Sequence, residues 1–163
     1  MRQAYITYIR PLLEYASNVW SPHLITQVNS LEKVQRHFTK RIIELHELSY
    51  KDRLTVLNLE TLEHRRLSSD LTMYYKVFHN LTPWPPSDYF NVFIPPHDLQ
   101  SVHHDFNIRK PLCRTNTFAN DFFNRRVSAW NSLPSFIVNS NYVASFKRSL
   151  ANIDLSKFLI YTF

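Results

Sequence analysis

The chain of 163 residues contains no glycine. At an average frequency of about 7%, a chain of this length would hold roughly 11. Glycine lets the backbone adopt positive φ angles and lets a loop approach a phosphate closely. Its absence therefore excludes the phosphate-binding loops of P-loop and dinucleotide-binding proteins, and also the G-x-S-x-G turn of serine hydrolases.

Turns in a chain without glycine must rely on other residues. Asparagine tolerates positive φ better than most residues and replaces glycine at some helix C-termini. Asn58 and Asn80 each stand where a helical pattern stops. We therefore expect both to adopt left-handed conformations.

Hydrophobic periodicity predicts a mainly α-helical fold. The clearest helix covers 24–46, where apolar residues recur at spacings typical of one helix face: Val28, Leu31, Val34, Phe38, Ile42 and Leu45. Pro11 should kink or restart a helix over 3–17, and Ser21-Pro22 is typical of a helix start. Further helices are expected from the Ser49–Asp52 capping box to Asn58, at 61–79, near 87–91, at 117–132 and at 141–152.

These elements suggest three regions. Residues 1–81 form a helical bundle, 82–116 a Pro-rich irregular connection, and 117–163 a tail with two further helices. A connection this long is either functional or a tether. Residues 156–163 are a candidate strand.

The composition favours a basic intracellular protein. There are 19 Lys and Arg against 13 Asp and Glu, giving a net charge of +6. This excess permits phosphate binding without demanding it. Cys113 is the single cysteine, so no internal disulfide can form, and no apolar run resembles a signal peptide or a membrane span. We expect the nucleus or cytoplasm and no membrane association.

No residue pattern predicts catalysis. The seven Asp are scattered without an adjacent pair, whereas two-metal chemistry needs convergent carboxylates. Cys113 lies in a segment without a scaffold to hold a base near it. The spacing of His97, His103, His104 and Cys113 matches no common zinc pattern. We therefore predict neither catalytic residues nor metal ligands.

Clusters of basic residues are the remaining candidates for a functional site. Lys33, Arg36, His37 and Lys40 share a strip roughly 100° wide on the 24–46 helix, opposite the apolar seam. The candidate nucleic-acid-binding residues are Lys33, Arg36, Lys40, Arg65, Arg66, Arg109, Lys110, Arg125 and Arg126. A solvated face explains each cluster taken singly, and the recurrence of several clusters of one sign is what favours phosphate binding. Phe122, Phe123 and Trp130, beside the last pair, are expected in the core rather than as base-stacking residues.

Several segments, in order, resemble the region downstream of the polymerase core in non-LTR (LINE-like, Jockey/CR1-type) retrotransposon reverse transcriptases. They are 8–23 (YIRPLLEYASNVWSPH), 31–36 (LEKVQR), 48–54 (LSYKDRL), 62–67 (LEHRRL), 122–126 (FFNRR), 130–134 (WNSLP) and 145–147 (SFK). The match runs over nearly the whole chain.

The resemblance implies a C-terminal fragment, with residues 1–81 as a thumb-like domain. In such enzymes the helical thumb grips the backbone of the RNA/DNA primer–template behind the active site. The catalytic aspartates and their Mg lie upstream, in a palm marked by a Tyr/Phe-Ala-Asp-Asp motif, and this chain has no Asp-Asp pair. The partners implied are the primer–template and the parent enzyme's palm and fingers, and no cofactor is expected in this chain.

The alternative is a non-catalytic helical module that binds protein. It rests on the same amphipathic helices and on the apolar surface that an isolated thumb would expose.

Overall fold

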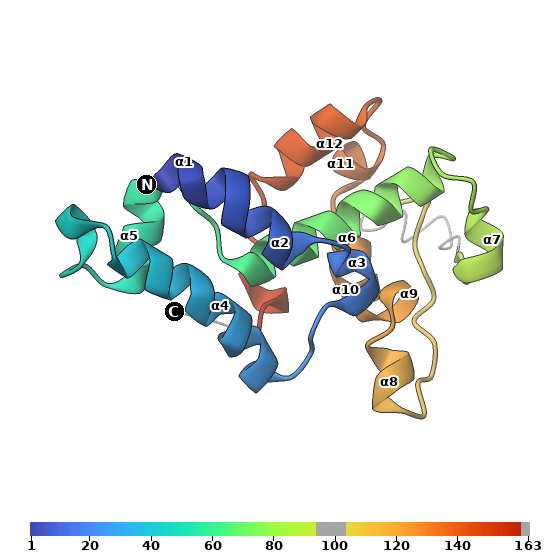
Figure 1. Cartoon of the computed structure of the whole chain (residues 1–163). Coiled ribbons are helices and arrows are strands. Elements are labelled where there is room, and N and C mark those ends of the chain that lie inside the picture. Colours follow the sequence, from blue (N-terminus) through green and yellow to red (C-terminus); the bar gives the residue numbers. More distant parts are fainter. Residues whose placement is uncertain (94–103, 161–163) are drawn as a thin grey trace. The chain divides into compact units, whose positions relative to one another are not determined.

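The computed structural model describes residues 1–93 and 104–160. The chain is mainly α-helical, as the periodicity predicts (Figure 1). Within these described ranges, extended segments pair only at an isolated antiparallel bridge between Val92 and Ile108. The chain forms two compact units, Met1–Arg66 with the segment from Ser156, and Leu67–Leu155. The units therefore divide at a different place from the expected boundary at 81/82.

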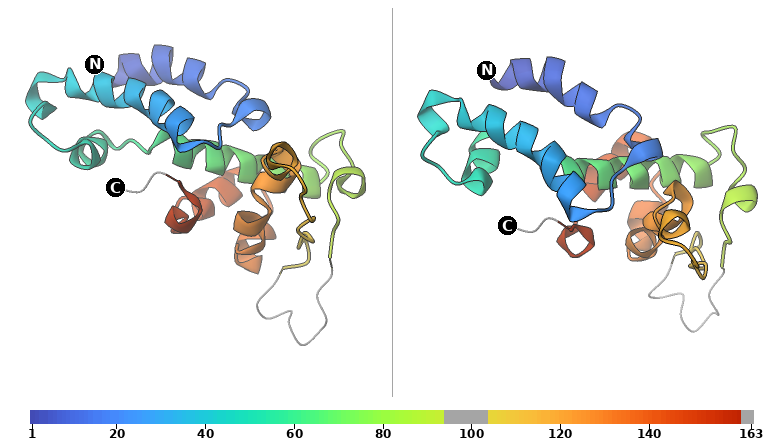
Figure 2. Two further views of the ribbon diagram at one scale, coloured as in Figure 1. Left: turned by 90° about the horizontal axis from the view of Figure 1, so that it is seen from below. Right: turned by 60° about the horizontal axis from the view of Figure 1, so that its bottom comes forward.

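The first unit contains the N-terminal helices and the segment that carries the basic strip. Its elements are α1 (Arg2–Ala4), the π-helix η1 (Tyr5–Ile9), α2 (Arg10–Glu14), α3 (Ser17–Trp20), α4 (Ile25–Lys40), the 3₁₀ turn η2 (Ile43–Leu45), α5 (Tyr50–Leu57), the start of α6 (Leu62–Phe78) and the 3₁₀ turn η4 (Ser156–Phe158). In each view of Figures 1 and 2, α4 runs beside the helical segment formed by α1, η1 and α2.

The kink expected near Pro11 takes the form of a π-helical turn. The backbone N–H of Arg10 bonds to the carbonyl of Tyr5, five residues back. Pro11 has no N–H to donate to the Thr7 carbonyl, so a regular α-helical ladder cannot pass through it. The widened turn absorbs this mismatch just before the proline.

The helix predicted over 24–46 is shorter in the structure. The 24–46 helix begins at Ile25 rather than at Ser21-Pro22 and ends at Lys40, because the β-branched pair Ile42-Ile43 is a weak helix former and Ile42 is extended. The N-cap predicted at Ser49 is confirmed, since its hydroxyl accepts the Asp52 N–H at 3.2 Å and lies 2.6 Å from the Asp52 carboxylate.

Both asparagines predicted to be left-handed are so, with φ of 47° at Asn58 and 54° at Asn80. At Asn58 the helix closes by bonds from Leu59 N to Leu54 O (2.9 Å) and from Asn58 N to Thr55 O (3.1 Å). Equivalent bonds close α6 around Asn80. Both ends are therefore Schellman motifs with asparagine in the position that usually holds glycine.

The second unit is built on the C-terminal part of α6. Its other helices are α7 (Pro86–Tyr89), α8 (Asn116–Ala119), α9 (Phe122–Arg125), α10 (Val127–Asn131), α11 (Ser135–Val138) and α12 (Val143–Leu150). The apolar seam of α6, formed by residues spaced four, three and four apart, is buried: Leu67, Leu71, Tyr74 and Phe78. Trp130 packs against it, with ring centroids 5.3 Å from Phe78 and 5.8 Å from Tyr74. Of the three aromatic residues expected in the core, Trp130 is fully buried, whereas Phe122, which packs on Tyr74, and Phe123 are half-buried.

Two predictions for the tail are wrong. The 117–132 helix is broken into α8, α9 and α10, because the Asp121 carboxylate accepts the Phe122 N–H at 2.7 Å and starts a new helix there. The candidate strand is a 3₁₀ turn at Ser156–Phe158, and 161–163 lie outside the described residues.

Of the predicted 82–116 connection, 94–103 lie outside the described residues, and the described part contains α7, near the short helix expected at 87–91. Part of it is nevertheless held in the core. The indole N–H of Trp130 donates to Phe106 O at 2.8 Å, and the Asn131 amide bonds both N and O of Ile108. Of the candidate zinc ligands, His97 and His103 lie outside the described residues.

Ala16 was not expected at a left-handed position, yet its φ is 51° and its ψ is 27°. This conformation costs a residue with a Cβ about 1–2 kcal/mol. Replacing Ala16 with glycine removes that strain, while the extra backbone entropy of glycine costs about 0.5–1 kcal/mol. We predict that Ala16→Gly raises the free energy of unfolding, measured by urea denaturation, by about 0.5–1 kcal/mol.

The control is Ala144→Gly, in the right-handed helix α12. It relieves no strain and should lower the free energy of unfolding by about 0.5–1 kcal/mol. Equal losses in the two variants would show that Ala16 is unstrained.

Candidate nucleic-acid interface on helix α4

The inner face of α4 is held by a buried network of polar side chains. The Tyr5 hydroxyl donates to Gln35 Oε1 at 2.6 Å, and Gln35 Nε2 donates to the Tyr50 hydroxyl oxygen at 2.9 Å. The Tyr50 hydroxyl in turn donates to Glu32 Oε1. Glu32 Oε2 accepts the backbone N–H of Leu62 at 3.0 Å. This chain of bonds connects η1, α4, α5 and the first residue of α6.

The network explains why the apolar seam expected on α4 is only partly buried. Glu32, Gln35 and Thr39 are fully buried, whereas Val34, from the middle of the expected seam, is 41% exposed. Buried polar groups must be hydrogen-bonded, and here each one has partners on neighbouring elements. Hydrogen bonding rather than apolar periodicity therefore sets the rotation of α4.

Glu32 is the central ionisable group of this network. Burial raises the pKa of its carboxyl above the ordinary value, and hydrogen bonds from Tyr50 and Leu62, together with the charge of Arg66, act in the opposite sense. Leu62 is the first residue of α6, where backbone N–H groups have no intrahelical acceptor. The carboxylate therefore also lies where a helix dipole favours negative charge.

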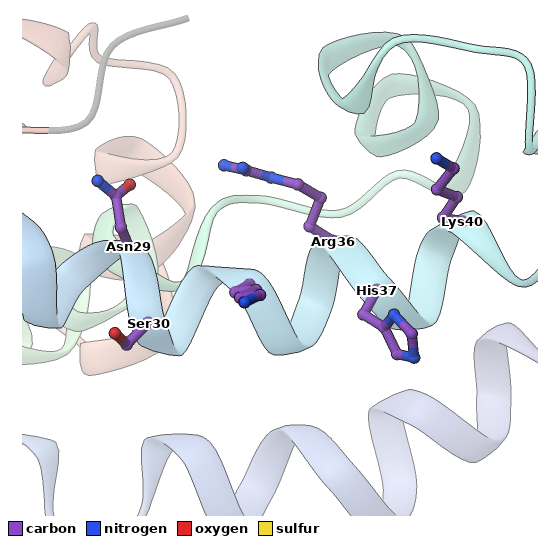
Figure 3. Close-up of a pocket in the computed structure, with 6 residues that line it drawn as sticks. Asn29, Ser30, Arg36, His37 and Lys40 are labelled. Atoms are coloured by element: carbon purple, nitrogen blue, oxygen red, sulfur yellow. The ribbon is translucent and has the colours of Figure 1, made fainter.

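The opposite face of α4 carries the predicted basic strip. Lys33, His37 and Lys40 are exposed. Arg36 is half-buried, with its guanidinium carbon 5.1 Å from the ring centroid of Tyr50. The four side chains line one pocket together with Asn29 and Ser30. In Figure 3, Asn29, Arg36 and Lys40 extend from one side of α4, and Ser30 and His37 from the other.

Asn29 and Ser30 were not among the predicted site residues. Continuing the spacing of the strip one turn toward the helix start would have found them, since Asn29 stands four residues before Lys33. Both supply polar groups that can bond to a phosphate or sugar oxygen without carrying charge.

The two lysines of the strip carry their charge at exposed positions. Within the described ranges, Lys33 and Lys40 form no ion pair. The acidic residue of α4, Glu32, faces the interior. Lys40 and His37 lie in the last turn, where cations stabilise the helix dipole, but Lys33 lies two turns earlier and gains nothing from it.

Arg65 and Arg66 do not extend this surface. The Arg65 guanidinium is bound by Glu14 and lies 3.5 Å from a Glu60 oxygen, and the bond to Glu14 raises the pKa of Arg65. Arg66 is 1% exposed and acts on the charge of Glu32 from within the unit. The burial of Arg66 removes it from the candidate residues.

Arg125 and Arg126 are also engaged internally. Arg125 binds both oxygens of the fully buried Asp70, at 2.8 and 2.9 Å, and Arg126 Nε lies 3.1 Å from Asp70 Oδ2. A buried carboxylate needs such cations, so these arginines hold the fold together. The sequence held a signal for this, since Asp70 lies three residues after Leu67 and four before Tyr74, beside the buried seam of α6.

Arg109 and Lys110 are exposed in the second unit. The Arg109 guanidinium lies 5.5 Å from the Phe93 ring centroid, and Lys110 Nζ lies 3.4 Å from Ser128 Oγ. They form a smaller basic surface, separate in the chain from the strip on α4.

Over residues 1–93 and 104–160, no group of three or more His, Cys, Asp or Glu side chains is arranged to hold a metal ion. No helix in those ranges combines the length and apolar character that crossing a bilayer requires.

A comparison with known proteins finds similarity over part of the chain. An uncharacterized protein of Caenorhabditis elegans, B0403.1, is 28% identical over 76 residues, which is 45% of this chain and 38% of the relative. The chain thus covers well under half the length of that protein. No protein family profile matches the chain, and no solved structure matches it.

The raised pKa of Glu32 predicts a pH dependence of stability. Between the ordinary pKa near 4.5 and its higher folded value, the folded state holds a proton that the unfolded state has lost. Stability contributed by Glu32 therefore falls as pH rises through this window, by at most about 1.4 kcal/mol per pH unit. Urea unfolding from pH 3 to 7 should show this fall in the wild-type chain relative to Glu32→Gln.

Glu60 provides the matched control, because its hydrogen bond with His64 lowers its pKa. Stability contributed by Glu60 is present above pH 4.5 and is lost as pH falls below that value. The difference in unfolding free energy between the wild-type chain and Glu60→Gln should therefore rise as pH increases from 3 to 7. Parallel curves for wild type and Glu32→Gln would contradict the buried position of Glu32.

Proposed function

We propose that the exposed face of α4 binds the phosphate backbone of an RNA or DNA duplex without reading its sequence. The observation that carries this proposal is the strip formed by Lys33, Arg36, His37 and Lys40, which faces outward while the acidic residue of the same helix is buried. Lysine and arginine contacts to phosphates supply most sequence-independent affinity for nucleic acids.

The dimensions of the strip suit this role. Lys33 and Lys40 are seven residues apart, which is about 10 Å along a helix. At about 3.4 Å of duplex axis per phosphate of one strand, that length spans about three nucleotide steps, with Arg36 and His37 between the ends. Asn29 and Ser30 add polar side chains to the same pocket, one from each side of α4 (Figure 3).

The buried network supports the proposal by holding the strip in a fixed orientation. Gln35 and Glu32 lie on the inner face of α4 and bond to three neighbouring elements. A helix anchored in this way presents its cations without further ordering, which lowers the entropic cost of binding.

In this proposal the chain corresponds to the thumb and C-terminal region of a non-LTR retrotransposon reverse transcriptase. Its ligand is then the primer–template, and its protein partners are the parent polymerase's palm and fingers. The catalytic aspartates and their Mg belong to that palm. Such a protein would act in the nucleus or cytoplasm. The support is the ordered set of sequence resemblances together with the basic strip on α4.

Removing two cations from the strip should weaken the salt dependence of duplex binding. Each phosphate contact contributes a slope of about −0.9 in a plot of log affinity against log salt concentration. We predict that Lys33→Ala/Lys40→Ala flattens this slope by about 2 units, measured by fluorescence anisotropy with a blunt duplex of mixed sequence. Adding Arg36→Gln should bring the total to between 2 and 3 units.

The control variant is Lys147→Ala/Lys157→Ala, which removes the same charge from exposed positions outside α4. It should leave the slope within about 0.5 units of wild type. Equal slopes for both double variants would exclude α4 as the binding surface.

A second candidate function is protein binding through the N-terminal helices. Tyr8, Leu12, Tyr15 and Val19 are between 73% and 82% exposed. Exposed apolar side chains in such number are typical of a protein interface. Duplex affinity insensitive to the α4 variants, together with concentration-dependent self-association in sedimentation experiments, would favour this function over the first.

A further inference from the structure

A second pocket adjoins the basic strip at the start of α4. It is lined by Trp20, Ser21, Pro22, His23, Gln27, Ser30 and Leu31. Ser30 also lines the basic pocket, so the two hollows share a wall. The surface therefore changes along α4 from four basic side chains at one end to an indole and an apolar floor at the other.

Trp20 is held in place but not covered. Its indole N–H donates to the carbonyl of Tyr15 at 2.5 Å, and the side chain remains 41% exposed. Half-buried Pro22 and Leu31 supply further apolar contact. A fixed, partly exposed indole beside a row of cations is the arrangement in which proteins stack a nucleobase while tracking a backbone.

The rim of this pocket is polar. His23 and Gln27 are exposed, and over the described ranges neither side chain forms a hydrogen bond. An imidazole and an amide can each donate to or accept from the edge of a base. The pocket thus combines a stacking face with groups that hydrogen-bond the base edge and do not require one particular base.

We propose that this pocket takes an unpaired nucleobase, stacked on Trp20, from a strand whose phosphates lie along Lys33, Arg36 and Lys40. The preferred ligand is then a duplex that continues into a single strand rather than a blunt duplex. This inference rests on the proposed function of the basic strip and adds the substrate class. A paired base cannot enter the pocket, because its faces are covered by its neighbours in the stack.

The test compares two probes by fluorescence anisotropy, a blunt duplex and the same duplex with a short single-stranded overhang. The wild-type chain should bind the overhang probe more tightly. Trp20→Ala should remove this preference, a loss of about 5- to 150-fold for the overhang probe, with the salt slope unchanged. Trp20→Phe should keep part of the preference because it keeps an aromatic face.

Trp84→Ala is the matched control, because Trp84 is also 41% exposed but lies outside α4 and the residues of this pocket. It should bind both probes as wild type does. An overhang of abasic sites should lose the preference in the wild-type chain, which tests the pocket without altering the fold.

Failure of the base pocket and failure of the basic strip give different results. If the wild-type chain binds both probes equally, or if Trp20→Ala keeps the preference, the base pocket is overturned. The salt slopes of the lysine variants then still test whether the basic strip contacts phosphates. If Lys33→Ala/Lys40→Ala leaves the slope unchanged, the strip is overturned and the base pocket with it.

Discussion

The first unit depends on a carboxylate that is buried between helices. Glu32 accepts hydrogen bonds from the Tyr50 hydroxyl and from the first backbone N–H of α6, and Gln35 links the same tyrosine to Tyr5. A fully satisfied network of this kind fixes one arrangement, because any rotation of α4 would leave several buried groups without partners. The outward direction of the basic strip is a consequence of that constraint.

Arginines serve the two units in different ways. In the second unit, Arg125 and Arg126 neutralise the buried Asp70 and join α6 to the short helices that follow. In the first, Arg53 is buried and donates to Thr39 and to the Leu48 carbonyl, which closes the turn before α5. These arginines therefore stabilise the fold and do not face solvent. The net charge of the chain overstates how much positive charge its surface offers to a nucleic acid.

The segments on which the proposed relation to reverse transcriptases rests contain several of these interior groups. Glu32 and Gln35 lie in 31–36, Tyr50 and Arg53 in 48–54, and Trp130 in 130–134. The resemblance therefore bears first on how the chain folds, and the function proposed for its surface needs its own test.

The helical class, the asparagine-closed helix ends and the core positions of α6 were predictable because they depend on local periodicity and on the steric limits of residues with a Cβ. The rotation of α4 was not, since it follows from bonds between residues as distant as Tyr5 and Gln35. Arg125 and Arg126 looked like a surface pair for a similar reason: their partner, Asp70, lies 55 residues earlier. Ala16 carried no local signal for a left-handed conformation.

The central claim is that lysines of the α4 strip touch the nucleic-acid backbone, and lysine footprinting tests it most directly. The chain is acetylated with and without a saturating duplex, and the modification of each lysine is measured by mass spectrometry. We predict that the duplex lowers the acetylation of Lys33 and Lys40 several-fold and leaves Lys147 and Lys157 unchanged. Equal protection of all four lysines, or none at Lys33 and Lys40, would contradict the account.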